Sequence, residues 1–85
     1  MKNSIKNKNI LITGATGSFG QHFIDYVLTK FKPKRVVIYS RDELKQYEMN
    51  QKFRKYRNIL RYFIGDVRDL GRLNDAFNNI DVVIH

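Results

Sequence analysis

Ile10-Leu11-Ile12-Thr13-Gly14-Ala15-Thr16-Gly17-Ser18-Phe19-Gly20 is the stretch that decides the fold of this 85-residue chain. Three glycines at three-residue spacing follow a short apolar run, and an amphipathic segment continues from the last of them. Glycine lets a strand turn sharply into a helix while the backbone approaches a bound group more closely than a side chain permits. Taken without its flanks, the triplet also fits an ordinary tight turn. With them, it predicts a strand, a turn and a helix whose first N–H groups face a pyrophosphate.

Apolar segments with strand and helix periods alternate along the chain. The predicted strands span residues 8–13, 35–39, 60–64 and 81–85. The predicted helices span residues 18–31, 42–56 and a short segment from residue 69 onward, with Asp42 and Asp69 as N-caps. Strands that alternate with helices form a parallel sheet covered on both faces. The expected fold class is therefore α/β, a Rossmann-type sheet of about four strands that is truncated after the fourth.

Each predicted helix carries an apolar face that we expect to pack on the sheet. The strands should be buried on both faces, because Ile10, Leu11 and Ile12 are consecutive apolar residues rather than alternating ones. The expected inward residues are Ile24, Val27, Leu28 and Phe31 on the first helix, Met49, Phe53 and Tyr56 on the second, and Leu70, Leu73, Phe77 and Ile80 on the third.

Length and composition limit the classes of protein that this chain can represent. We interpret residues 1–85 as the N-terminal part of a Rossmann domain with a flexible leader at residues 1–7, and we expect the catalytic and substrate-binding part to be absent. The chain has no cysteine, which fits a reducing compartment, and its apolar runs are too short for a signal peptide or a membrane span. The expected location is the cytoplasm.

The formal net charge is +8, from 16 Lys and Arg residues against 8 Asp and Glu residues, which favours an anionic partner. The basic residues are distributed over several segments, a pattern more typical of a solvated surface than of a groove. No nucleic-acid partner is expected. A basic nucleic-acid-binding module stays open as an alternative, although helical spacing already explains the tyrosines among the lysines.

The end of the second predicted strand should meet the adenosine ribose of a bound dinucleotide. In this fold an acidic residue there accepts hydrogen bonds from the ribose hydroxyls of NAD, whereas an arginine suits the 2′-phosphate of NADP. Ser40, Arg41 and Lys45 can donate to a phosphate, so the segment favours NADP over NAD. The alternative is that Arg41 and Lys45 are solvated residues at a helix start and that Asp42 is only a cap.

A third candidate position, Gly65-Asp66-Val67, follows the third predicted strand. Asp66 could accept a hydrogen bond from the adenine amino group, and Val67 could offer its backbone N–H. An aspartate in a loop is also a routine turn residue, so this position is a weaker signal than the glycine turn.

Longer stretches of the chain resemble a known family. Residues 13–20 match the T-G-x-x-G-x-x-G pattern of extended short-chain dehydrogenases/reductases. Residues 38–49 (IYSRDELKQYEM) and 61–69 (RYFIGDVRD) look like the inverting UDP-N-acetylglucosamine 4,6-dehydratases of bacterial surface-glycan pathways. The resemblance covers nearly the whole chain after the leader.

The resemblance implies an NADP-dependent lyase that oxidises carbon 4 of a nucleotide sugar by hydride transfer, eliminates water across carbons 5 and 6, returns the hydride to carbon 6 and inverts carbon 5. At full length it implies a homo-oligomer without a membrane partner, and no metal site is predicted. The family's Lys-His-Val-Pro segment and catalytic Tyr-x-x-x-Lys pair are expected outside this chain, so no catalytic residue is predicted and the chain alone should be inactive. The predicted cofactor contacts are Gly14, Thr16, Gly17, Ser18, Phe19, Gly20, Ser40, Arg41, Asp42, Lys45, Asp66 and Val67.

Within this resemblance, residues 16–19 would line the pyrophosphate, residues 40–45 the adenosine ribose and its phosphate, and Asp66 with Val67 the adenine. Another extended short-chain dehydrogenase, such as a sugar-nucleotide epimerase, or a cofactor-sensing regulator is the nearest alternative. The residues that would separate these possibilities belong to the absent C-terminal part.

Overall fold

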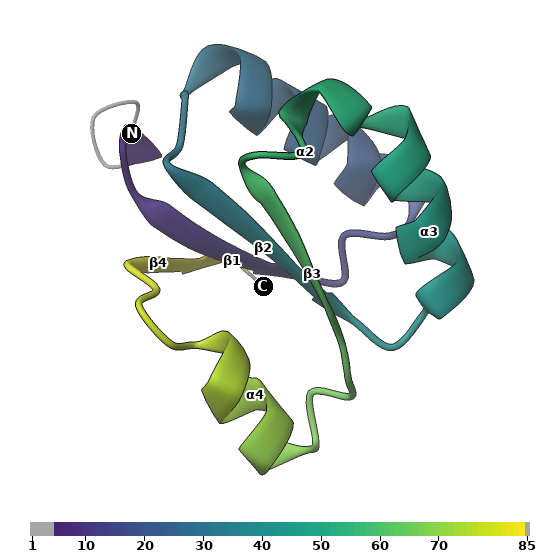
Figure 1. Ribbon diagram of the computed structural model, residues 1–85. Helices are drawn as coiled ribbons and strands as arrows, with labels where there is room; N and C mark the ends of the chain where they lie inside the picture. Colours follow the sequence, from purple (N-terminus) through teal and green to yellow (C-terminus); the bar gives the residue numbers. More distant parts are fainter. Residues whose placement is uncertain (1–4, 85) are drawn as a thin grey trace.

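The strands form one parallel sheet in the order β3-β2-β1-β4 (Figure 1). The computed structural model describes residues 5–84. Its elements are β1 (Asn9–Thr13), α2 (Ser18–Lys30), β2 (Arg35–Ser40), α3 (Glu43–Lys52), the 3₁₀ turn η1 (Arg54–Tyr56), β3 (Leu60–Ile64), α4 (Leu70–Ala76) and β4 (Val82–Ile84). The strand order matches the first part of the Rossmann order 3-2-1-4-5-6. The predicted α/β class, with helices on both faces of a parallel sheet, is confirmed.

α2 and α3 lie together on one face of the sheet, where the larger part of the core forms (Figure 1). The consecutive apolar residues of β1 are buried on both faces, as expected for a central parallel strand. The inward faces predicted for the first two helices are confirmed, with Phe31 and Tyr56 partly buried at the margin. This cluster consists of Ile5, Ile10, Ile12, Ala15, Ile24, Val27, Leu28, Val36, Ile38, Met49, Phe53 and Leu60.

α4 covers the other face, where the buried cluster is smaller (Figure 1). Leu73 and Ile80 pack against this cluster, as predicted. The remaining half-buried contact is Phe63 of β3. The fully buried members are Leu11, Val37, Tyr39 and Ala76.

Two of the inward residues predicted for the third helix are wrong. Leu70 is 71% exposed and Phe77 is 39% exposed. α4 has only seven residues, and the buried side chain that it presents to the sheet is the small Ala76. The helix is therefore rotated so that Leu70, its first residue, points toward solvent.

Both predicted N-caps are confirmed. The Asp42 carboxylate accepts a hydrogen bond from the backbone N–H of Lys45 at 3.0 Å, and the Asp69 carboxylate accepts one from that of Arg72 at 3.1 Å. Side-chain caps of this kind satisfy N–H groups that have no partner within the helix. They fix where the chain leaves the sheet edge and enters α3 and α4.

The observed α3 is shorter than the helix predicted there. α3 ends at Lys52, earlier than the predicted residue 56, because the backbone of Phe53 leaves the helical conformation (φ −105°, ψ 32°) and the chain continues as η1. The buried side chain of Phe53 fixes this end of α3 in the core. Within residues 5–84, no helix combines the length and the hydrophobicity that a bilayer span requires.

The leader predicted over residues 1–7 falls only partly within the described structure. Residues 1–4 and His85, the predicted end of the last strand, lie outside the described residues. Ile5, by contrast, is 3% exposed and belongs to the larger core cluster, and the Asn7 backbone N–H donates to the Lys32 carbonyl at 3.2 Å. This corrects the inner end of the leader, because an apolar side chain placed before β1 is packed in the core.

Candidate functional site

Two adjacent cavities at the carboxyl edge of the sheet share Gly14. In open α/β sheets, ligands bind at this edge where the strand order reverses, and here the reversal lies at β1, between β2 and β4. The first cavity, about 560 Å³, is lined by Gly14, Thr16, Tyr39, Ser40, Arg41, Asp42, Gly65, Asp66, Val67 and Arg68. The second, about 480 Å³, is lined by Ile12, Thr13, Gly14, Ala15, Gly17, Ser18, Phe19, Gly20, Phe23 and Ile84. All of the predicted cofactor contacts except Lys45 therefore line one of the two cavities.

The glycine turn joins β1 to α2 and forms the wall between the cavities. Gly14 has φ +66°, a left-handed conformation that glycine adopts at little cost. Gly20 lies against the turn itself, since a Cβ there would be 2.5 Å from the Cα of Ala15. Gly17 faces open space, with no atom within 4 Å of a Cβ built at that position. The glycines thus serve different needs: backbone conformation at Gly14, close packing at Gly20 and open approach at Gly17.

The N-terminus of α2 opens beside the second cavity. Its N-cap is Gly17, so no side chain caps the helix, and its first turn carries no acidic residue. The first N–H groups of a helix carry partial positive charge and bind anions, phosphates in particular. This geometry suits a pyrophosphate, the group that the sequence predicts here.

The end of β2 turns into α3 through a short hydrogen-bonded segment. The Ser40 hydroxyl oxygen accepts from the Asp42 backbone N–H at 3.0 Å. Gln46 of α3 is 4% exposed, and its amide nitrogen donates to the carbonyls of Ser40 at 3.2 Å and Phe63 at 2.9 Å. The buried amide therefore ties the ends of β2 and β3 together and fixes the backbone from which Arg41 projects.

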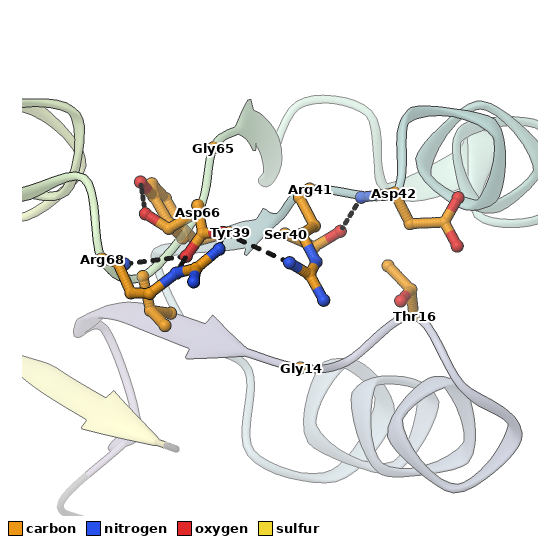
Figure 2. Close-up of a pocket in the computed structure, with 10 residues that line it drawn as sticks. Gly14, Thr16, Tyr39, Ser40, Arg41, Asp42, Gly65, Asp66 and Arg68 are labelled. Atoms are coloured by element: carbon orange, nitrogen blue, oxygen red, sulfur yellow. Dashed lines mark hydrogen bonds and ion pairs between the residues drawn. The ribbon is translucent and has the colours of Figure 1, made fainter.

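Lys45 does not reach either cavity. Its ammonium group lies 3.9 Å from the Glu48 carboxylate one helical turn away, and its side chain is 52% exposed. Asp42 lines the first cavity while its carboxylate caps α3. For Lys45 and Asp42 the geometry matches the alternative of a solvated helix-start residue and a cap. Arg41 projects into the cavity, as Figure 2 shows.

Asp66 lies between two arginines at the margin of the first cavity (Figure 2). Its carboxylate accepts hydrogen bonds from the Arg68 backbone N–H at 2.9 Å, from Arg68 Nε at 3.1 Å and from Arg68 Nη2 at 2.8 Å. Arg41 Nη1 donates to the same carboxylate at 3.3 Å. Mainly through the Arg68 hydrogen bonds, with a smaller contribution from the charge of Arg41, the pKa of Asp66 is held well below its usual range. Asp66 is therefore a carboxylate at any physiological pH.

Two lining residues of the first cavity were missed by the sequence reasoning, Tyr39 and Arg68, and Gly65 was named only as the start of the Asp66 turn. The buried Tyr39 hydroxyl donates to the Asp66 backbone carbonyl at 2.9 Å. Burial raises the pKa of Tyr39 above its ordinary value, so the phenol keeps the proton that it donates. Gly65 lies directly over this phenol, where a Cβ would overlap the hydroxyl. The only available signal was the position of Arg68, two residues after Asp66 in the same loop.

Of the described residues that line the two cavities, none is a lysine. The spacing Tyr-x-x-x-Lys does occur in the chain, at Tyr26 and Lys30, but both lie in the second half of α2, which runs away from the cavities toward the start of β2. The Tyr26 ring packs edge-on against Phe31 at 5.3 Å between centroids. Between residues 5 and 84, no group of three or more His, Asp or Glu side chains is arranged to hold a metal ion.

Several of the chain's cations lie at the opposite edge of the sheet. Lys8 precedes β1, Lys34 and Arg35 lie at the start of β2, Arg57 precedes β3, and all four side chains are exposed. The lining of the first cavity, by contrast, carries two arginines and two aspartates. An anion that entered this cavity would therefore meet individual side chains rather than a surplus of positive charge.

Comparison with known proteins agrees with this geometry. A family model described as "Polysaccharide biosynthesis protein" matches residues 10–85. The chain is 56% identical over 78 residues to a UDP-N-acetylglucosamine 4,6-dehydratase (inverting) from Campylobacter jejuni. The aligned region covers 92% of this chain and 23% of that protein. It is 37% identical to a UDP-glucose 4-epimerase from Rickettsia bellii, over 93% of this chain and 24% of that protein.

Among solved structures, that of Pen from Bacillus thuringiensis aligns with a TM-score of 0.88 and 42% identity, over 95% of this chain and 25% of that one. The chain thus spans about a quarter of the length of the relatives it matches. Over this segment the resemblance to the inverting dehydratases is confirmed, and it is stronger than the similarity to the epimerase.

Proposed function

This chain belongs to the polysaccharide biosynthesis protein family, and from that premise we propose that it is the NADP-binding N-terminal part of an inverting UDP-N-acetylglucosamine 4,6-dehydratase. The observation that carries the proposal is the pair of cavities that meet at Gly14, one beside the open N-terminus of α2 and the other beside Arg41 at the end of β2. A dinucleotide needs this pair: a place for its pyrophosphate and, next to it, a place for its adenosine.

The donor groups present fit NADP. The first N–H groups of α2, reached past the open position of Gly17, would hold the pyrophosphate. Arg41, whose side chain is 76% exposed and is held to Asp66 by a single 3.3 Å contact, would turn toward a 2′-phosphate on the ribose. Val67 and Asp66 lie where the adenine would rest. The nicotinamide of bound NADP would take up a hydride from the sugar and later return it.

The rest of the activity belongs to the proposal as well. Oxidation at carbon 4, loss of water across carbons 5 and 6, and binding of a nucleotide sugar require groups that the two cavities do not supply. We therefore propose that further chain, of the kind that makes up the other three quarters of the relatives, provides them. A cytoplasmic location, where nucleotide sugars and NADP are found, and homo-oligomerisation at full length complete the proposal.

The epimerase similarity favours a second candidate, a sugar-nucleotide epimerase that oxidises and reduces carbon 4 without eliminating water. Both enzymes would use the same cofactor-binding half, so the cavities described above do not separate them. The identity of 56% to the dehydratase against 37% to the epimerase favours the dehydratase.

Turnover assays with two sugars separate these candidates. We expect a longer protein that begins with this segment to convert UDP-N-acetylglucosamine into a 4-keto-6-deoxy product and to leave UDP-glucose without epimerisation to UDP-galactose. The 85-residue chain alone should convert neither, because its cavities contain no catalytic group. Epimerisation without dehydration by the longer protein would reverse the assignment. Product formation by the 85 residues alone would show that catalytic groups lie within this segment.

A further inference from the structure

The Arg41, Asp66 and Arg68 side chains form a charged cluster at the margin of the first cavity (Figure 2). The two arginines hold Asp66 very unequally. Arg68 contributes its backbone N–H and two guanidinium nitrogens, at 2.8 to 3.1 Å, whereas Arg41 contributes one contact at 3.3 Å. Arg68 is thus the principal partner of the Asp66 carboxylate, and Arg41 is bound to it only at the margin.

This cluster is a poor device for stabilising the fold. The side chains of Arg41 and Arg68 are 76% and 81% exposed, and ion pairs between exposed groups contribute little to the free energy of unfolding. A bidentate contact between a guanidinium and a carboxylate does, however, fix geometry and charge locally. The cluster is therefore better placed to set the charge and geometry at the cavity margin than to stabilise the fold.

The charged side chains that line the first cavity bear on the role of Arg68. Two arginines are balanced by two aspartates, Asp42 and Asp66. The Asp42 carboxylate is occupied as the N-cap of α3, and the Asp66 carboxylate is occupied by Arg68. With both carboxylates engaged elsewhere, the guanidinium of Arg41 can leave its single contact and bind an incoming anion.

We infer that Arg68 is a positioning residue for 2′-phosphate recognition: by occupying Asp66 it releases Arg41 to bind the phosphate. The inference rests on the proposed function, because it takes the anion to be the 2′-phosphate of NADP. Without Arg68, the Asp66 carboxylate would hold Arg41 and would also repel the phosphate. NAD, which has no 2′-phosphate, would be affected much less.

A double-mutant cycle read out as the affinity ratio of NADP⁺ to NAD⁺ tests this inference. In calorimetric titrations of the chain, Arg68→Gln should weaken NADP⁺ binding about tenfold and change NAD⁺ binding by less than about threefold. Adding Asp66→Asn to Arg68→Gln should restore most of the ratio, since no carboxylate then competes for Arg41. Arg68→Lys, which keeps the charge without the bidentate geometry, should fall between the wild type and Arg68→Gln.

Arg54→Gln is the matched control, because Arg54 is an exposed arginine of η1 that lines neither cavity, and its loss changes the net charge equally. It should leave both affinities unchanged. An equal loss of NADP⁺ and NAD⁺ binding in Arg68→Gln, or no loss of either, would overturn the inference and leave the proposed function intact. A wild-type chain that binds neither nucleotide would overturn the proposed function, and the inference with it.

Discussion

Replacing Gly20 by alanine is expected to destabilise the chain by about 1–3 kcal/mol and to abolish nucleotide binding. The new Cβ would lie 2.5 Å from the Cα of Ala15 and 2.7 Å from both its carbonyl carbon and its carbonyl oxygen. These are backbone atoms of the turn, so no side-chain rotation can relieve the overlap. The start of α2 would have to move away from the end of β1, and the wall between the two cavities would move with it. Urea unfolding followed by circular dichroism measures the loss.

Gly17→Ala is the control for this prediction, because it places the same methyl group in the same turn without a clash. Nothing lies within 4 Å of that Cβ, and the φ of −76° suits any residue. Alanine is a poorer N-cap than glycine, but it also reduces the entropy of the unfolded chain, so the two effects nearly cancel. Gly17→Ala should therefore keep wild-type stability and weaken nucleotide binding only through the narrower approach to the pyrophosphate. Equal stabilities of the Gly20 and Gly17 variants would contradict the packing argument.

Gly65→Ala should lower the free energy of unfolding by a comparable amount, about 1–3 kcal/mol, for a different reason. Its Cβ would overlap the hydroxyl of Tyr39 and lie 2.8 Å from Cζ of the same ring, which is buried and has no room to withdraw. Displacing the ring would break the 2.9 Å hydrogen bond from the Tyr39 hydroxyl to the Asp66 carbonyl. The loop that carries Asp66 would then keep the bond from the Gly65 backbone N–H to the Ser40 carbonyl, but it would lose its side-chain anchor to β2.

Gly71→Ala supplies the matched control, since it makes the same change six residues later. Gly71 lies inside α4, and the nearest atom to its Cβ is an Asp69 carboxylate oxygen at an ordinary 3.7 Å. Gly71 is the second residue of α4, where alanine should be favoured over glycine by no more than the roughly 0.5–1 kcal/mol of a helix interior, so this variant should be slightly more stable than the wild type. The two glycine substitutions should thus shift the urea midpoint in opposite directions. A shift of the same sign in both would refute the assignment of Gly65 to a close approach over Tyr39.

The parts of the fold that depend on local pattern could be predicted from the sequence. The runs of consecutive apolar residues predict buried parallel strands, and Asp42 and Asp69 predict the helix starts, because capping involves only the next few residues. The two halves of the site followed from topology, since the carboxyl ends of parallel strands meet at one edge of the sheet. Alternation of strands and helices was therefore enough to bring the glycine turn and Arg41 to one place.

What the sequence could not predict depends on contacts between residues far apart in the chain. The hydroxyl of Tyr39 reaches a carbonyl 27 residues away, and this contact is what requires a glycine at Gly65. The rotation of α4 was mispredicted because periodicity ranks large apolar residues as inward. In the structure, α4 packs on the sheet through the small side chain of Ala76. Arg68 was missed because its role depends on the carboxylate that it holds, and its position two residues after Asp66 does not by itself show that contact.

The most direct test of the account is a titration of the ¹⁵N-labelled chain with NADP⁺ and with NAD⁺, followed by the chemical shifts of individual backbone N–H groups. We expect NADP⁺ to shift the signals of the glycine turn, of Ser40 and Arg41, and of the loop from Asp66 to Arg68. It should do so at lower concentration than NAD⁺, and Arg41→Ala should remove that difference. Saturating NADP⁺ that shifted no signal at this edge, or only those of the cations at the opposite edge such as Lys8, Lys34 and Arg57, would contradict the account.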